Sequence, residues 1–215
     1  MLCHDNSAPN HVATLGYETG FIQVEGIAGS ETNAALIADY IANLGPDHHN
    51  RPLILVGYSK GLPDIFAFLV GYPELTHIPG AECEKKDSTA LETLSPANRE
   101  AWFAEHIRYY SVVAFPNPDN ISNGLQRFHR QLGELKDARN DAQVVFYDQV
   151  IPASTVLGFF NADHWAMSVP IARQHEVSQA LFANQNDFPR EIALGAVLRY
   201  VEEDLNTATP SQSDQ

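Results

Sequence analysis

The sequence predicts an α/β fold, in which helices alternate with the strands of a mostly parallel sheet. Short apolar runs such as residues 53–56 have the continuous hydrophobicity of strands that are buried on both faces. Segments with apolar residues at helical spacing follow these runs, and Gly and Pro mark their boundaries. The length of 215 residues, with 44% hydrophobic and 19% charged residues, suits one soluble globular domain.

The expected elements alternate along the chain. Strands are expected at residues 20–26, 53–56 and 109–115, and two further apolar segments lie at 144–147 and 155–160. Helices are expected at 34–41, 62–70 and 125–138, and Pro189 opens a last amphipathic helix. A polar stretch at about 76–108 is expected outside the core, and the tail 207–215 is expected to fray.

The charge and the cysteines exclude several classes of protein. The net charge is −14, and such an acidic surface repels phosphate backbones, so we expect no nucleic acid partner. The first residues do not resemble a signal peptide, and no apolar run is long enough for a membrane helix, so we expect a cytoplasmic protein without stable membrane insertion. Cys3 and Cys83 make neither a disulfide framework nor a zinc site.

The pentapeptide Gly57-Tyr58-Ser59-Lys60-Gly61 stands between a predicted buried strand and a predicted helix. A nucleophilic serine needs a tight, strained turn of this kind, and small residues two positions before and after it let neighbouring backbone pass close by. The helix that follows offers free N–H groups and a partial positive charge. Ser59 is therefore the candidate nucleophile, and the N–H of Lys60 is a candidate oxyanion donor. We expect the Lys60 side chain to point to solvent.

A serine hydroxyl needs a base, and in a strand–turn–helix context of this kind the base is a histidine that follows an acid in the chain. His164 comes just after the apolar segment 155–160, in a loop where the catalytic groups of open α/β sheets lie. His175 lies inside a predicted helix and is the weaker candidate. His48 and His49 are adjacent, but without a further cluster they favour a solvated turn over a metal site.

Two carboxylates compete for the role of the acid that orients His164. Asp141 and Asp148 both precede the histidine, and either could hold an imidazole in the required tautomer. Asp163 is adjacent to His164 and is expected to be structural. The residues alone therefore leave Asp141 and Asp148 as alternatives.

The chain resembles the α/β-hydrolase esterases and lipases of bacteria. The matching pieces are the pentapeptide around Ser59, Tyr109-Tyr110-Ser111, Asn140-Asp141-Ala142 and Ala162-Asp163-His164. Two positions that hold glycine in related patterns hold Ala142 and Ala153 here. The likeness implies that Asp141 is the acid, with Asp148 as the alternative.

The resemblance also implies a fold, and the sequence departs from this fold in two places. The implied fold is one α/β-hydrolase-type domain over residues 1–215, with helices on both faces of the sheet. Little chain precedes the strand at 20–26, and no apolar strand follows the helix at 62–70, so we expect about five or six strands. The first departure leaves Lys60 as the one obvious oxyanion donor. Bared sheet edges favour association, so a homodimer is expected to be accessible.

The function implied is hydrolysis of carboxylic esters through Ser59, Asp141 and His164. The substrate would be a small-molecule ester or lipid, and this chemistry implies no cofactor. One alternative is a degenerate, non-catalytic interaction protein, which the missing amino-terminal strands favour. Another is an amidase or acyltransferase that uses the same three residues, because amide cleavage and acyl transfer need the same groups.

Overall fold

The computed structural model describes residues 8–45, 48, 51–76, 107–168 and 187–208. The chain folds as two compact units. The sheet unit comprises Met1–Thr19, Tyr110–Val150 and Thr155–Gln215, and the helix unit comprises Gly20–Tyr109 and Ile151–Ser154. The single domain expected over residues 1–215 stays a prediction. In the described part of the chain, no helix is long and apolar enough to cross a membrane.

The sheet unit is built on two parallel strands, β1 (Tyr110–Ala114) and β2 (Thr155–Phe160). The register pairs Tyr110 with Thr155 and Ala114 with Phe160, with one irregular step after Ser111. Parallel strands need a long crossover, and helix α7 (Gln126–Leu135) lies in the connection between these two. Both strands confirm the expected apolar segments, and the parallel pairing with intervening helices confirms the α/β class.

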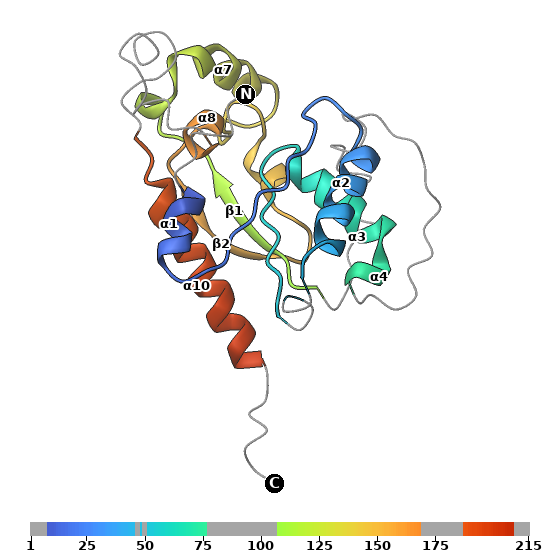
Figure 1. Ribbon diagram of the computed structural model, residues 1–215. Helices are drawn as coiled ribbons and strands as arrows, with labels where there is room; N and C mark the ends of the chain where they lie inside the picture. Colours follow the sequence, from blue (N-terminus) through green and yellow to red (C-terminus); the bar gives the residue numbers. More distant parts are fainter. Residues whose placement is uncertain (1–7, 46–47, 49–50, 77–106, 169–186, 209–215) are drawn as a thin grey trace. The chain divides into compact units, whose positions relative to one another are not determined.

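Helix α10 (Arg190–Ala208), the longest in the described part of the chain, covers part of this unit (Figure 1). The hydroxyl of Tyr110 on β1 donates to Asp204 of α10 at 2.6 Å, and the Tyr110 ring meets Tyr200 edge-on. Helix α1 (Ala8–Thr14) packs on α10, where a Cβ at Gly195 would lie only 3.0 Å from the Leu15 side chain. The described residues of this unit also form the short helical elements η4 (Pro118–Asn120), η5 (Asn123–Leu125), η6 (Phe146–Gln149) and α8 (His164–Ser168).

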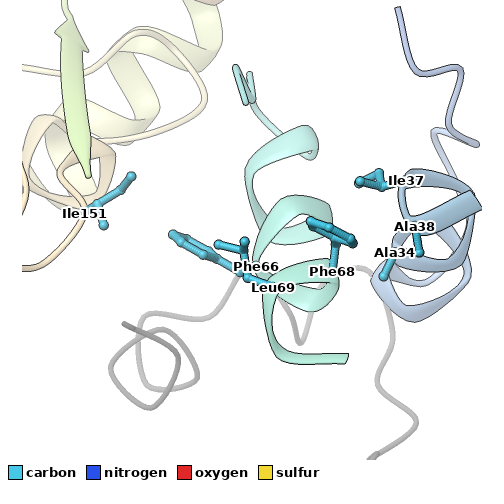
Figure 2. Close-up of a cluster of buried hydrophobic side chains, with 7 residues drawn as sticks. All are labelled: Ala34, Ile37, Ala38, Phe66, Phe68, Leu69 and Ile151. Carbon is cyan, nitrogen blue, oxygen red and sulfur yellow. The ribbon is translucent and has the colours of Figure 1, made fainter. Parts of the chain in front are cut away.

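The helix unit is held together by α2 (Ser30–Ala42) and α3 (Gly61–Gly71), with the short α4 (Pro73–Thr76) after them. Figure 2 shows its buried cluster: Phe68 points from α3 toward α2, and Phe66 points toward Ile151. Burying each such phenylalanine contributes about 1.5–3 kcal/mol, so this cluster is what fixes α3 against α2. The four longer helices that the sequence predicts are all present, although α10 runs on to Ala208, beyond the expected start of the tail at 207.

In the described residues the sheet has two strands, β1 and β2, fewer than the five or six expected for the whole chain. Residues 20–26 join no ladder, and the N–H and C=O of Glu25 are instead bonded to the Asn33 side chain. Residues 53–56 also join no ladder, and Leu53 and Val56 are 55% and 64% exposed rather than buried. The apolar segment 144–147 turns into η6 after a single bridge between Asn140 and Val145.

Three further expectations fall wholly or mostly outside the described residues. The polar excursion at 76–108 is described only at its two ends, where Thr76 closes α4 and Ile107 packs against the core of the helix unit. His175 and both cysteines also lie outside the described ranges.

Candidate active site

Ser59 lies at the entrance to α3 with a backbone φ of 53°, in the left-handed region. Non-glycine residues adopt this region rarely, because their Cβ crowds the backbone, and such strain concentrates at functional sites. Two hydrogen bonds close the turn: Gly61 N–H donates to the Tyr58 carbonyl at 2.9 Å, and Leu62 N–H donates to the Ser59 carbonyl at 3.1 Å. The backbone around Ser59 therefore has the strained geometry expected of a nucleophile turn.

The two glycines of the turn have different environments. A Cβ built on Gly57 would lie 2.9 Å from the Ile65 side chain and 3.0 Å from the Gly61 carbonyl oxygen and the Leu62 Cα. Only glycine fits there, because the first turn of α3 passes directly over this position. The position of Gly61 is open, with no atom of the described residues within 4 Å of a built Cβ.

The expectation that the Lys60 side chain points to solvent is wrong. Its ammonium group pairs with the carboxylate of Asp64, one turn further along α3, and donates to Ser30 Oγ at 3.3 Å. The Lys60 side chain is 18% exposed and that of Asp64 is 1% exposed. The backbone N–H of Lys60 precedes the first residue of α3, where the helix dipole favours negative charge.

In the sheet unit, the structure brings Asp141 and His164 together. His164 Nδ1 lies 2.7 Å from Asp141 Oδ2, and the His164 N–H donates to the Asp141 carbonyl at 2.9 Å. Both residues are buried. The other carboxylate oxygen, Oδ1, accepts the N–H groups of Gln143 and Val144 at 2.9 and 2.7 Å. Both oxygens of the carboxylate are thus held: Oδ1 by the backbone and Oδ2 by Nδ1 of His164.

The turn that carries Asp141 is shaped by its neighbour Asn140, which is fully buried. Asn140 Oδ1 accepts the Ala142 N–H at 2.9 Å, and its amide donates to the Asp137 carbonyl at 2.9 Å. Ala142 has a φ of 80°, so this alanine occupies a backbone conformation that favours glycine. The sequence motif Asn140-Asp141-Ala142 therefore builds a tight turn that presents the carboxylate.

Gln149 ties this turn to the sheet. Its side-chain amide accepts the Ala114 N–H at 2.6 Å and donates to the Ala114 carbonyl at 2.8 Å and the Val144 carbonyl at 3.0 Å. Ala114 is the last residue of β1. The acid turn is therefore fixed relative to the carboxyl end of that strand.

His164 follows the carboxyl end of β2 and is the first residue of α8. Asp163 caps this helix: its Oδ1 accepts the N–H groups of Trp165 and Ala166 at 3.0 and 2.9 Å, and its Oδ2 accepts the Ser122 N–H at 2.6 Å. Asp163 thus has the structural surroundings that the sequence predicts. It positions the start of α8, and with it the imidazole of His164.

The other candidate acid, Asp148, lies elsewhere. Its Oδ2 is 3.9 Å from Nζ of Lys136, and its N–H donates to the Val145 carbonyl at 3.0 Å. Of the two carboxylates that the sequence leaves open, Asp141 is the one that is hydrogen-bonded to His164. Ser59 and Lys60 belong to the helix unit.

A second histidine near the acid turn escapes the sequence analysis. His129 lies in α7, and its Nε2 is buried without a hydrogen-bond partner among the described residues. Burial lowers the pKa of His129, and the nearby charges of Asp163 and Asp141 oppose this shift. Gln149 also escapes it, because its role depends on contacts with the distant backbone of Ala114. Asp64 had a local signal, its position four residues after Lys60 on a helix.

The described residues contain no cluster of side chains suited to bind a metal ion. Within the described ranges, no three His, Cys, Asp or Glu side chains come close enough to hold a metal ion.

Two solved structures are similar to this chain. The metagenomic carboxyl esterase MGS0156 is 32% identical, with a TM-score of 0.76, and the match covers 95% of this chain and 70% of the esterase. The mature lipase BlEst2 of Bacillus licheniformis is 17% identical, with a TM-score of 0.56, and the match covers 76% of this chain and 78% of the lipase. The likeness to this lipase is one of fold. No family model and no curated protein matches the sequence.

Proposed function

The chain belongs to the α/β-hydrolase esterases and lipases, and from that premise we propose that it cleaves carboxylic esters with Ser59 as nucleophile, His164 as base and Asp141 as the acid that orients it. The observation that carries the proposal is the positive φ of Ser59 in a glycine-bounded turn at the start of α3. Such strain concentrates at functional sites, and a nucleophile turn requires it.

The hydrogen bond between Asp141 and His164 supports their proposed roles as acid and base. With Nδ1–H donated to the carboxylate, Nε2 is the nitrogen that takes the proton of the Ser59 hydroxyl. The Ser59 oxygen then bonds to the acyl carbon, and the carbonyl oxygen becomes an oxyanion. The N–H of Lys60 donates to this oxyanion, aided by the amino end of α3.

Collapse of the tetrahedral intermediate breaks the bond to the alcohol, which leaves with the proton from His164 Nε2. Water then attacks the acyl-enzyme, with His164 again accepting a proton, and the carboxylic acid leaves as Ser59 regains its hydrogen. The chemistry uses neither a metal ion nor a nucleotide. We propose short or medium acyl esters as the substrates, because the sequence contains no long apolar segment that could serve as a lid.

The test combines a covalent probe with turnover. Wild type and Ser59→Ala are incubated with a fluorophosphonate probe and assayed with p-nitrophenyl acetate and butyrate. We expect labelling to vanish in the variant and kcat/KM to fall at least about 10³-fold. Ser154→Ala serves as a matched control outside the proposed site and should behave like wild type.

Each competing function has its own outcome. Equal behaviour of wild type and Ser59→Ala, with no labelling of either, would favour the non-catalytic interaction protein. Labelling at Ser59 without ester turnover, but with cleavage of a p-nitroanilide, would favour an amidase. Transfer of the acyl group to an added alcohol in preference to water would favour an acyltransferase.

A further inference from the structure

A chain of polar side chains runs beneath the Ser59 turn and links it to α2. It begins at the Lys60 ammonium group, passes through the Asp64 carboxylate to Asn33 of α2, and ends at the backbone of Glu25. The Asn33 amide donates to Asp64 Oδ2 at 2.8 Å and to the Glu25 carbonyl at 2.9 Å, and its oxygen accepts the Glu25 N–H at 3.0 Å. All four residues belong to the helix unit.

The interior of this chain is fully buried. Asn33 and Asp64 are completely buried, and so is Ser30, whose hydroxyl oxygen accepts the second hydrogen bond of the Lys60 ammonium group. Each oxygen of the Asp64 carboxylate has a partner, Lys60 on one side and Asn33 on the other. The charge of Asp64 is therefore compensated, and its carboxylate is held in one orientation.

Such a buried ion pair is a poor device for stability alone. Removing two charges from water costs much of what their attraction returns, and apolar residues of similar volume often stabilise a fold equally well. A buried polar chain does, however, restrict where its members can lie, because each group must keep its partner. The effect of these polar contacts on the position of Lys60 is therefore a better guide to their role than their effect on stability.

Lys60 is the residue whose position matters most for the proposed reaction. It directly follows Ser59, and its backbone carbonyl accepts the Asp64 N–H at 3.3 Å, so Asp64 holds Lys60 by both side chain and backbone. The peptide N–H of Lys60 lies between two fixed points, the strained Ser59 and the side-chain anchor.

We propose that the side chain of Lys60, anchored by Asp64 and Asn33, is a positioning device that aims the Lys60 N–H at the oxyanion. This inference rests on the proposed function. The lysine side chain does not itself touch the substrate. Its loss leaves the donor N–H in the chain but lets the peptide unit move.

The proposal predicts a specific kinetic signature. A donor that binds the oxyanion acts on the transition state and hardly on the bound ester, so its misplacement lowers kcat and leaves KM nearly unchanged. Complete loss of one oxyanion donor costs on the order of 10²- to 10³-fold. A donor that is present but loosened should cost less, about 10- to 100-fold in kcat, with KM within about twofold of wild type.

The decisive variant is Lys60→Met combined with Asp64→Asn. The single change Lys60→Met would leave the buried Asp64 charge without its ammonium partner and would destabilise the fold. The double variant removes both charges and keeps an acceptor for Asn33, so the thermal unfolding midpoint should stay near wild type. The anchor is nevertheless lost, because methionine cannot bind the asparagine as the ammonium group binds the carboxylate. Lys136→Met, at an exposed ion pair, is the matched control and should leave kcat unchanged.

The outcomes separate this inference from the proposed function. If wild type is not labelled by the fluorophosphonate probe, the proposed function fails first. If wild type is labelled and the stable double variant keeps the wild-type kcat, the positioning role is overturned and the pair is merely structural. If the double variant does not reach the wild-type midpoint, Ser30→Ala decides, because it removes the second hydrogen bond of the ammonium group and leaves the ion pair with Asp64 in place. A two- to fivefold fall in kcat at constant KM supports the role, and an unchanged kcat overturns it.

Discussion

The turn at Ser59 and the turn at Asp141 solve a similar problem with different contacts. Each contains a non-glycine residue with positive φ, Ser59 in one and Ala142 in the other, and each fixes a buried carboxylate. Around Ser59 the contacts that shape the turn itself are short in sequence, since Gly57, Lys60 and Asp64 all lie within one loop–helix segment. Two longer contacts, from Asp64 to Asn33 and from Lys60 to Ser30, join this segment to α2. Around Asp141 the main contacts join residues that are distant in sequence. Asp141 and His164 are 23 residues apart, and Ala114 and Gln149 are 35 residues apart.

The difference shows which parts of a site a local motif can encode. The Ser59 turn can be recognised from five consecutive residues, because its geometry depends on them and on the first turn of one helix. The Asp141 turn depends on where β1 and β2 end, so its recognition needs the fold. Substitutions at the two turns should therefore have different effects, and four experiments test this.

The largest effect should come from the acid. Asp141→Asn removes the negative charge that holds and stabilises the imidazole, and loss of this group in a serine hydrolase costs about 10⁴-fold in kcat. The Asn side chain has nearly the same size, so the fold should survive. Asp148→Asn is the matched control and should lower kcat less than about threefold, since Asp148 lies near Lys136. A larger loss in Asp148→Asn than in Asp141→Asn would reverse the assignment.

The next effect concerns the close packing at Gly57. Gly57→Ala places a methyl group 3.0 Å from backbone atoms of Gly61 and Leu62, which cannot move without shifting α3. We expect a loss of about 1–3 kcal/mol in the free energy of unfolding, measured in urea. Gly61→Ala meets open space among the described residues and should change stability by less than about 0.5 kcal/mol. Equal losses at the two positions would contradict this account of the turn.

A smaller, stabilising effect is expected where alanine occupies the left-handed region. Ala153 has a φ of 60° and is exposed, so Ala153→Gly should relieve strain and raise the free energy of unfolding by about 0.5–1 kcal/mol. Ala142 has a φ of 80° but is buried, so Ala142→Gly also loses a buried methyl group worth about 0.8 kcal/mol. Its net change should be near zero. A gain at Ala142 larger than that at Ala153 would show that burial is not the difference.

The smallest effect concerns the pH dependence of stability. Burial lowers the pKa of His129 below its ordinary value near 6.5, so the unfolded chain binds this proton more readily than the folded one. The contribution of neutral His129 to the free energy of unfolding is therefore fully present above about pH 6.5, and it is lost as the pH falls through the pKa of the folded state. The urea midpoint of wild type should fall more between pH 7 and pH 5 than that of His129→Gln. Parallel curves for the two proteins would show that His129 does not contribute.

The sequence predicts the helices of this molecule better than its strands. The four longer helices follow from apolar periodicity and boundary residues, which act within one segment. The runs at 20–26 and 53–56 have strand-like composition, but a strand exists only where a neighbour supplies ladder hydrogen bonds. At Glu25 the side chain of Asn33 takes that place, and no local pattern announces such a competition.

The candidate site divides in the same way. Ser59 and His164 can be proposed from the sequence because a motif marks one and a predicted strand end marks the other. Residue types alone cannot separate Asp141 from Asp148, and the family resemblance was needed to prefer Asp141. Gln149 carries no sequence signal, since an amide side chain suits many surroundings, and Asn140 is marked only as part of the Asn140-Asp141-Ala142 motif. The direction of the Lys60 side chain was predicted wrongly, because an exposed lysine is the commoner case and its partner Asp64 is itself buried.

Gln149 also limits how the sheet can grow. Phe115 N–H donates to Phe160 of β2, so the backbone groups of the adjacent Ala114 point to the other side of β1. There the Gln149 amide binds both of them, as the peptide group of another strand would. A strand that approached β1 from that side would have to end or bend away before Ala114. Among the described residues β2 is the strand neighbour of β1, and on the other side of β1 the Gln149 side chain occupies the last N–H and C=O groups with which a further strand could pair.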